Sequence, residues 1–96
     1  MNAFFERYAG LLAEECAAVG HPIAEPELDA DLSRALLDLT RAVAHTQERR
    51  FGPLAAYLTG VALERARAGG AALDAAAATA LVDRVVERLE ADSADQ

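Results

Sequence analysis

Cysteine is almost absent from the sequence, which contains only Cys16, so no intrachain disulfide bond can form. A chain without disulfides fits a reducing compartment. Long apolar runs are also missing, and none approaches the ~20 residues that a membrane-spanning helix needs. The first residues carry acids early and lack the basic start that is typical of a signal peptide. We therefore expect a cytoplasmic protein.

Lysine is absent as well, because all nine basic residues are arginines. They stand against 16 acidic residues, which gives a net charge of −7. A chain of this charge repels phosphate backbones and anionic lipid surfaces. We expect neither general nucleic-acid binding nor association with a membrane.

Patterns typical of catalysis or metal binding are missing too. The histidines, His21 and His45, have no second ligand at a known metal spacing. Gly69–Gly70 is not followed by the lysine of a phosphate loop. Ser33 lies in a helical pattern and Ser93 near the end of the sequence, neither in the context of a nucleophile. The sequence predicts no enzyme, no catalytic residue, no metal site and no cofactor.

Helical periodicity runs through most of the 96 residues, a length that suits a single domain. Apolar residues recur at three- and four-residue spacing in four segments, and alanine, the best helix former, is abundant. Short connections favour antiparallel neighbours. The prediction is an all-α fold, a small antiparallel four-helix bundle with helices over residues 2–19, 26–47, 53–68 and 73–91 and a frayed tail from about 92.

Residues that start or stop helices set these boundaries. Asn2 and Asp74 are of the type preferred at helix N-caps, and Gly20 is of the type that ends helices. Pro26 is a favoured first helical residue. Gly52–Pro53 predicts a sharp boundary, with the glycine as cap and the proline as first residue of the third helix.

The apolar stripes predict which faces are buried. Aromatic Phe4, Phe5 and Tyr8 should make the first helix an anchor of the core, with Cys16 as a buried thiol. Gly60, in mid-helix, costs about 1 kcal/mol relative to alanine, which the close approach of another helix would explain. The other expected buried residues are Leu28, Leu32, Ala35, Leu36, Leu39 and Val43, then Leu54, Tyr57, Leu58, Val61 and Ala62 with Leu63 beside them, then Ala77, Ala78, Leu81, Val82, Val85 and Leu89.

Polar residues suited to binding gather around the connection between the second and third helices. Arg41, His45 and Arg49 would line one helix face if the helix continued to Arg49. Arg50 follows at the turn, and Glu48 could hold the His45 ring. With the N–H groups at the start of the next helix, these are the parts of a phosphate or nucleotide anion site.

Other interpretations of this surface stay open. Arginines near the end of a helix stabilise it through the helix dipole, so the cluster could be structural. Phe51 could anchor a protein partner instead. The candidate surface is therefore Arg41, His45, Glu48, Arg49, Arg50 and Phe51. A further alternative is a homodimer through alanine-rich faces of the third or fourth helix.

The stretch Leu37–Gly60 also carries a distinctive order of residues. It contains Leu37-Asp38-Leu39, Arg41, Val43-Ala44-His45, Glu48-Arg49, Pro53-Leu54, Leu58 and Gly60. This order resembles a small helical domain of unknown function from high-GC bacteria. That family occurs alone or fused to molybdenum-cofactor guanylyltransferases, which join molybdopterin to GMP. The matching stretch covers about a quarter of the chain.

Three positions depart from the family pattern. Ala42 stands where the family has an acid, Thr46 where it has a glycine, and Arg50 where it has a proline. If the missing acid orients the histidine, that arrangement is lost here. Since the family has no established activity, the resemblance implies a setting rather than a mechanism. The expectation is a non-catalytic accessory or interaction module in molybdenum-cofactor maturation, with a guanylyltransferase as partner.

Overall fold

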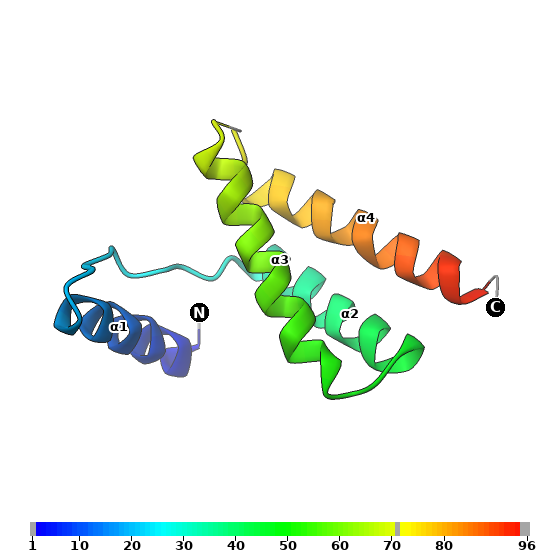
Figure 1. Cartoon of the computed structure of the whole chain (residues 1–96), viewed down its shortest axis with the longest axis horizontal. Coiled ribbons are helices and arrows are strands. Elements are labelled where there is room, and N and C mark those ends of the chain that lie inside the picture. The colour runs from blue at the N-terminus through cyan, green and yellow to red at the C-terminus, as the bar shows by residue number, and fades with distance from the viewer. Residues whose placement is uncertain (1, 71, 95–96) are drawn as a thin grey trace. The chain divides into compact units, whose positions relative to one another are not determined.

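The computed structural model describes residues 2–70 and 72–94, with side chains up to Asp92. Within these residues the regular structure is entirely helical, which confirms the all-α prediction (Figure 1). The helices are α1 (Ala3–Ala18), α2 (Ala30–Thr46), α3 (Phe51–Ala68) and α4 (Ala75–Ala94). In the described part of the chain, no helix combines the length and apolar character needed to cross a membrane.

The helix ends follow local capping chemistry. The backbone N–H of Phe4 donates to Oδ1 of Asn2 at 2.8 Å, as predicted for the start of α1. Gly20 has a φ of 87°, and the N–H groups of Gly20 and His21 donate to the carbonyls of Ala17 and Cys16. This pair of bonds is the Schellman arrangement, in which glycine accepts the left-handed conformation without strain. The predicted stop after α1 is confirmed.

Other boundaries differ from the prediction. The second helix was expected from Pro26 but begins at Ala30, directly after Asp29, a residue type preferred at the N-cap. The third begins at Phe51, so Pro53 occupies its first turn, where a missing N–H breaks no helical bond. The fourth begins at Ala75 rather than 73. It continues through Ala94, beyond the predicted end at 91, and residues 95–96 of the predicted tail lie outside the described residues.

The chain divides into two compact units, one up to Ala30 and one from Asp31 onward. The first unit holds α1 and the segment after it, where residues 21–29 have no regular structure. Described by itself, α1 contributes no buried residue, and Cys16 is only half-buried. The buried residues of the second unit come from α2, α3 and α4, and the anchoring of this core by α1 stays a prediction.

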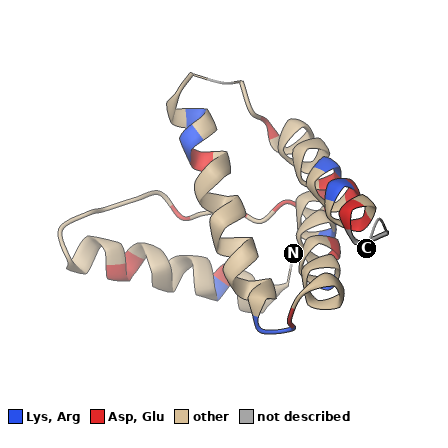
Figure 2. Ribbon diagram, turned by 45° about the vertical axis from the view of Figure 1, so that its right-hand side comes forward, with Lys and Arg blue, Asp and Glu red and all other residues tan. Residues whose placement is uncertain are grey.

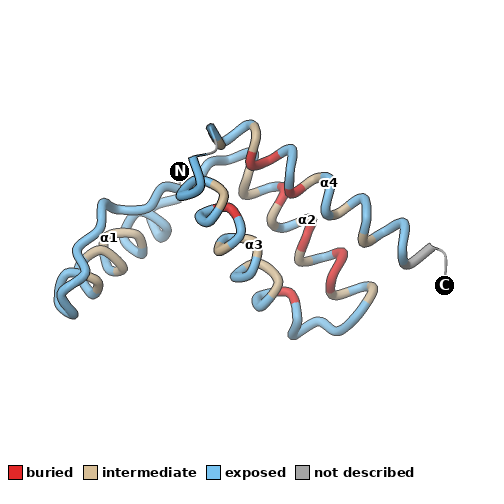
Figure 3. Tube along the Cα trace, turned by 45° about the horizontal axis from the view of Figure 1, so that its top comes forward, coloured by how far each residue is buried: buried red, intermediate tan, exposed pale blue. Residues whose placement is uncertain are grey.

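The second unit packs α2 against α3 and α4. Ala35, Leu39 and Val43 of α2 meet Val82 of α4 in the central cluster, as their spacing predicted (Figure 3). Partly buried side chains surround this cluster, namely Leu32, Leu36, Ala55, Val86 and Leu89. Two residues of the predicted α4 stripe, Leu81 and Val85, are exposed instead. The buried face of α4 centres on Val82 and Ala78, which leaves those two on its flank.

Glycine matters where α3 meets α2, although not at the predicted position. A Cβ on Gly52 would lie 3.3 Å from Thr40 Cβ, and Gly52 itself is buried. A side chain at this point would push Thr40 away by a few tenths of an ångström, so glycine suits the close approach of the two helices. A Cβ on Gly60 would meet nothing within 4 Å among the described residues. The close approach predicted for Gly60 is thus found at Gly52.

Candidate functional site

A groove of about 470 Å³ lies between α2 and α4, and two of the predicted site residues line it. Arg41 and His45, one helical turn apart on α2, share its wall. The complete lining is Asp38, Arg41, Ala42, His45 and Thr46 from α2 with Val86 and Glu90 from α4. The structure therefore brings together Arg41 and His45 and leaves Glu48, Arg49, Arg50 and Phe51 outside the groove.

Asp38 and Arg41 of this groove belong to a chain of ion pairs that extends beyond its lining. Arg41 donates to Asp38 at 3.2 Å, and Arg34 donates to the same carboxylate at 3.0 Å. Arg34 also reaches Asp83 of α4 at 3.1 and 3.2 Å, so it links the two helices. The bonds to Asp83, and then those to Asp38, raise the pKa of Arg34. Because Asp38 already pairs with Arg41, an anionic ligand would have to compete with a carboxylate for that guanidinium.

Two ionisable side chains of the groove have no such partner. The side chains of His45 and Glu90 form no hydrogen bond or ion pair with the described residues, and they come from different helices. Asp38 stands at helical spacing from both Arg34 and Arg41, and this spacing could have indicated from the sequence that Asp38 belongs to the site. No local pattern signals Glu90, because only packing of α4 against α2 brings it there.

The turn after α2 breaks the predicted row of basic residues. The helix ends at Thr46, and the last bond into it runs from the N–H of Gln47 to the Val43 carbonyl at 2.9 Å. Arg49 therefore lies in the turn rather than on the helix. The condition under which Arg41, His45 and Arg49 would line one helix face is therefore not met, since α2 stops before Arg49.

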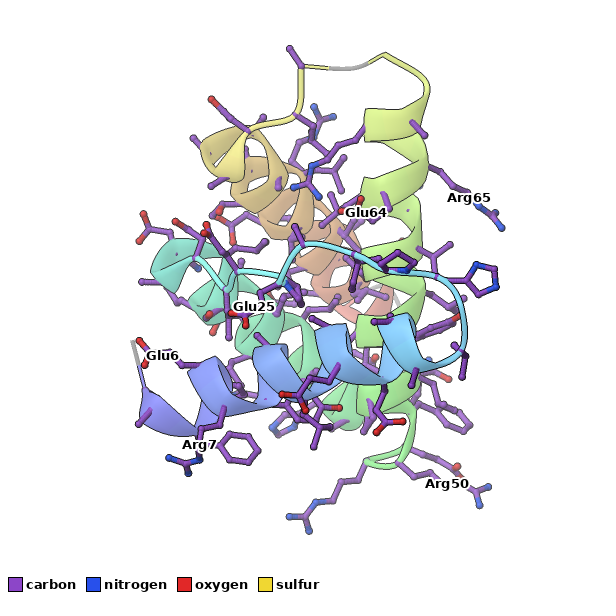
Figure 4. All side chains as sticks on the ribbon, turned by 90° about the vertical axis from the view of Figure 1, so that its left-hand side faces the viewer. Glu6, Arg7, Glu25, Arg50, Glu64 and Arg65 are labelled. Carbon is purple, nitrogen blue, oxygen red and sulfur yellow. The ribbon has the colours of Figure 1, made fainter. Side chains whose placement is uncertain are left out.

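Within the turn, the Arg50 side chain contacts Glu48 and Phe51. Its Nε donates to Glu48 at 2.8 Å, and its guanidinium carbon lies 5.8 Å from the centre of the Phe51 ring, a cation–π distance. Figure 4 shows the Arg50 side chain projecting from the turn between α2 and α3. Glu48 thus binds Arg50, and the suggestion that it holds the His45 ring is wrong. Arg49 forms no ion pair with the described residues.

The start of α3 offers fewer free backbone N–H donors than an anion-binding site uses. The N–H of Phe51 donates to the Glu48 carbonyl at 3.0 Å, and that of Gly52 donates to the Arg49 carbonyl at 3.2 Å. Pro53 has no N–H. The three first positions of α3 are therefore satisfied or lack a donor, which removes much of the attraction of this helix end for a phosphate.

An apolar face continues from the turn along α3, and the sequence expected it to be buried. Leu54, Tyr57 and Leu58 are 62%, 71% and 67% exposed. They follow Phe51 at helical spacing, and no charged residue interrupts positions 51–63 (Figure 2). Within the second unit this expectation is not met, because Gly52, the partly buried Ala55 and the buried Leu63 face the core and leave these three large side chains outside. This surface, Phe51–Leu58 with Arg49 and Arg50, is called the turn–α3 surface below.

Fold and site together define a small all-helical domain with a polar turn beside an apolar helix face. Residues 7–95 match the model of a family described as a domain of unknown function, DUF6457, and the chain belongs to this family. No curated protein and no solved structure matches the chain. In the part of the chain that is described, no group of three or more histidine, cysteine or acidic side chains could hold a metal ion.

Proposed function

We propose that this protein is a non-catalytic protein-interaction module that binds its partner through the turn–α3 surface. The observation that carries the proposal is the exposed apolar face of Leu54, Tyr57 and Leu58 next to two arginines. Three such side chains, each more than half exposed, present on the order of 400 Å² of surface. Patches of this size on a small domain commonly mark binding sites.

The composition of the turn–α3 surface suits a protein partner better than a small anion. Tyrosine and arginine are the residue types that contribute most to binding at interfaces. The Arg50–Phe51 pair adds a planar cation beside an aromatic ring at the edge of the apolar face. The polar turn would form the rim of the contact and the leucines its centre.

The proposed setting is the maturation of the molybdenum cofactor in the cytoplasm. It is supported by the resemblance over Leu37–Gly60, whose family accompanies molybdenum-cofactor guanylyltransferases. The proposed partner is such a guanylyltransferase. The predicted antiparallel four-helix bundle also stays a proposal, supported by the helical content and by the short connections from α2 to α3 and from α3 to α4.

A backbone NMR titration of the full chain with the guanylyltransferase catalytic domain tests the interaction. We expect shifts at residues 49–58. Leu58→Glu should weaken binding at least 10-fold, because it places a charge at the centre of the apolar contact. Leu37→Glu is the matched control, since Leu37 is a similarly exposed leucine on α2. Absence of shifts, or equal losses for both variants, would contradict the proposal.

A second candidate, binding of a phosphate or nucleotide anion, has one observation in its favour: Arg41 and His45 share the groove between α2 and α4. Adding inorganic phosphate and then GTP to the same labelled protein tests it. An anion site should shift Arg41 and His45, and its affinity should fall steeply with salt. Shifts with the guanylyltransferase alone would favour the interaction module, which should tolerate salt.

A further inference from the structure

The outer face of α4 carries a second groove, separate from both surfaces above. It has a volume of about 480 Å³ and is lined by residues of this one helix, namely Ala77, Ala80, Leu81, Arg84, Val85 and Arg88. Leu81 and Val85, 39% and 37% exposed, supply its large apolar side chains. The two alanines leave room for another helix to approach closely.

The charges along this face have opposite signs at its two ends. Asp74, Leu81 and Arg88 are spaced by seven residues, close to two helical turns, so they lie along one side of α4. An acid therefore stands seven residues before the leucine and a base seven residues after it. Figure 2 shows basic and acidic positions alternating along the later part of α4.

Such a face is complementary to itself when two copies meet antiparallel. A two-fold axis at Leu81 places Leu81 against its own counterpart and Ala77 opposite Val85 of the other copy. The same operation places Arg88 of each copy opposite Asp74 of the other, so one such pair forms at each end of the contact. In a parallel pair, by contrast, Arg88 would face Arg88 and Asp74 would face Asp74, and like charges would repel.

The two charged groups are available for this contact. The Oδ1 atom of Asp74 accepts from the N–H of Ala77 at 2.8 Å, which leaves its second carboxylate oxygen for an arginine. Neither Arg84 nor Arg88 forms an ion pair with the described residues. The net charge of −7 opposes association at long range, but salt at physiological strength screens it beyond about 8 Å.

We propose that the outer face of α4 binds a second copy of this chain as an antiparallel, two-fold-symmetric α4–α4 pair. Leu81 and Val85 form the apolar centre, and Arg88 pairs with Asp74 of the other copy at each end. A single pair of helices lies at the lower end of specific interface sizes, below about 1,200 Å² in total. The dimer is therefore weak and depends on protein concentration.

Cysteine cross-linking tests whether Leu81 lies on the axis. The full chain carries Cys16→Ser, so that an introduced cysteine is its only thiol. Under mild oxidation Leu81→Cys should yield a disulfide-linked dimer much faster than Leu37→Cys, an exposed position on another helix. Both variants should keep the helical circular dichroism of the parent. Equal cross-linking rates at the two positions would overturn the proposal.

Sedimentation equilibrium of the unmodified chain and of charge variants tests the antiparallel register. Asp74→Asn keeps an N-cap residue type and removes the charge, and Arg88→Gln removes the opposing charge. Each should raise the dimer dissociation constant about 2- to 30-fold, because each deletes both exposed ion pairs. The double variant should be no weaker than either single variant. A monomeric parent at millimolar concentration, tighter association of either variant, or independent effects would overturn the antiparallel pair.

Discussion

Truncation of Leu39 is the most direct test of the core. Leu39, 2% exposed, is one of the two largest fully buried side chains among the described residues. Replacing it with alanine removes roughly three methylene equivalents at about 0.8 kcal/mol each, or about 2.4 kcal/mol. The cavity left behind brings the expected loss to roughly 2.7–5 kcal/mol. That is a large share of the roughly 5–10 kcal/mol expected for a domain of this size.

Leu37 is the matched control, because it lies on the same helix and is 64% exposed. Leu37→Ala should cost less than about 1 kcal/mol, since little of its area leaves water on folding. Urea unfolding followed by circular dichroism measures both variants, and similar slopes with denaturant show that the midpoints can be compared. A loss below about 1 kcal/mol for Leu39→Ala, or equal losses for both variants, would refute the core described above.

The remaining predictions concern two glycines and one cap. Gly52→Ala should destabilise the protein by about 1–3 kcal/mol in thermal unfolding, because the new methyl group meets Thr40 at 3.3 Å; an unchanged melting temperature would contradict this. Gly60→Ala should stabilise it by up to about 1 kcal/mol, since that helical position is open, and a loss would show a contact that the structure lacks. Asp74→Ala should cost about 0.5–2 kcal/mol, whereas Asp74→Asn should stay within a few tenths, because only alanine loses the cap to Ala77; equal losses would argue against the cap.

The candidate site was predictable in part, and the limit was geometric. Arg41 and His45 share a surface because their four-residue spacing lies inside α2. Whether Arg49 joins them on the helix could not be decided from the sequence, because the end of a helix depends on a balance of capping groups worth a few tenths to about 2 kcal/mol. Glu90 could not be found at all, because its place in the groove depends on the packing of α4 against α2.

Local chemistry in the sequence determined the helical content, the caps at Asn2 and Asp74, the stop at Gly20 and the buried stripe of α2. These features depend on neighbours within about one or two helical turns, so they can be recognised without a fold.

Tertiary packing decided which apolar side chains stay outside. α3 is apolar on nearly every side over positions 51–63, so periodicity alone could not say which side is buried. The close contact at Gly52 turned its small residues toward α2 and left Leu54, Tyr57 and Leu58 exposed. The turn–α3 surface therefore follows from helix packing, and the sequence supplied only the side chains that form it.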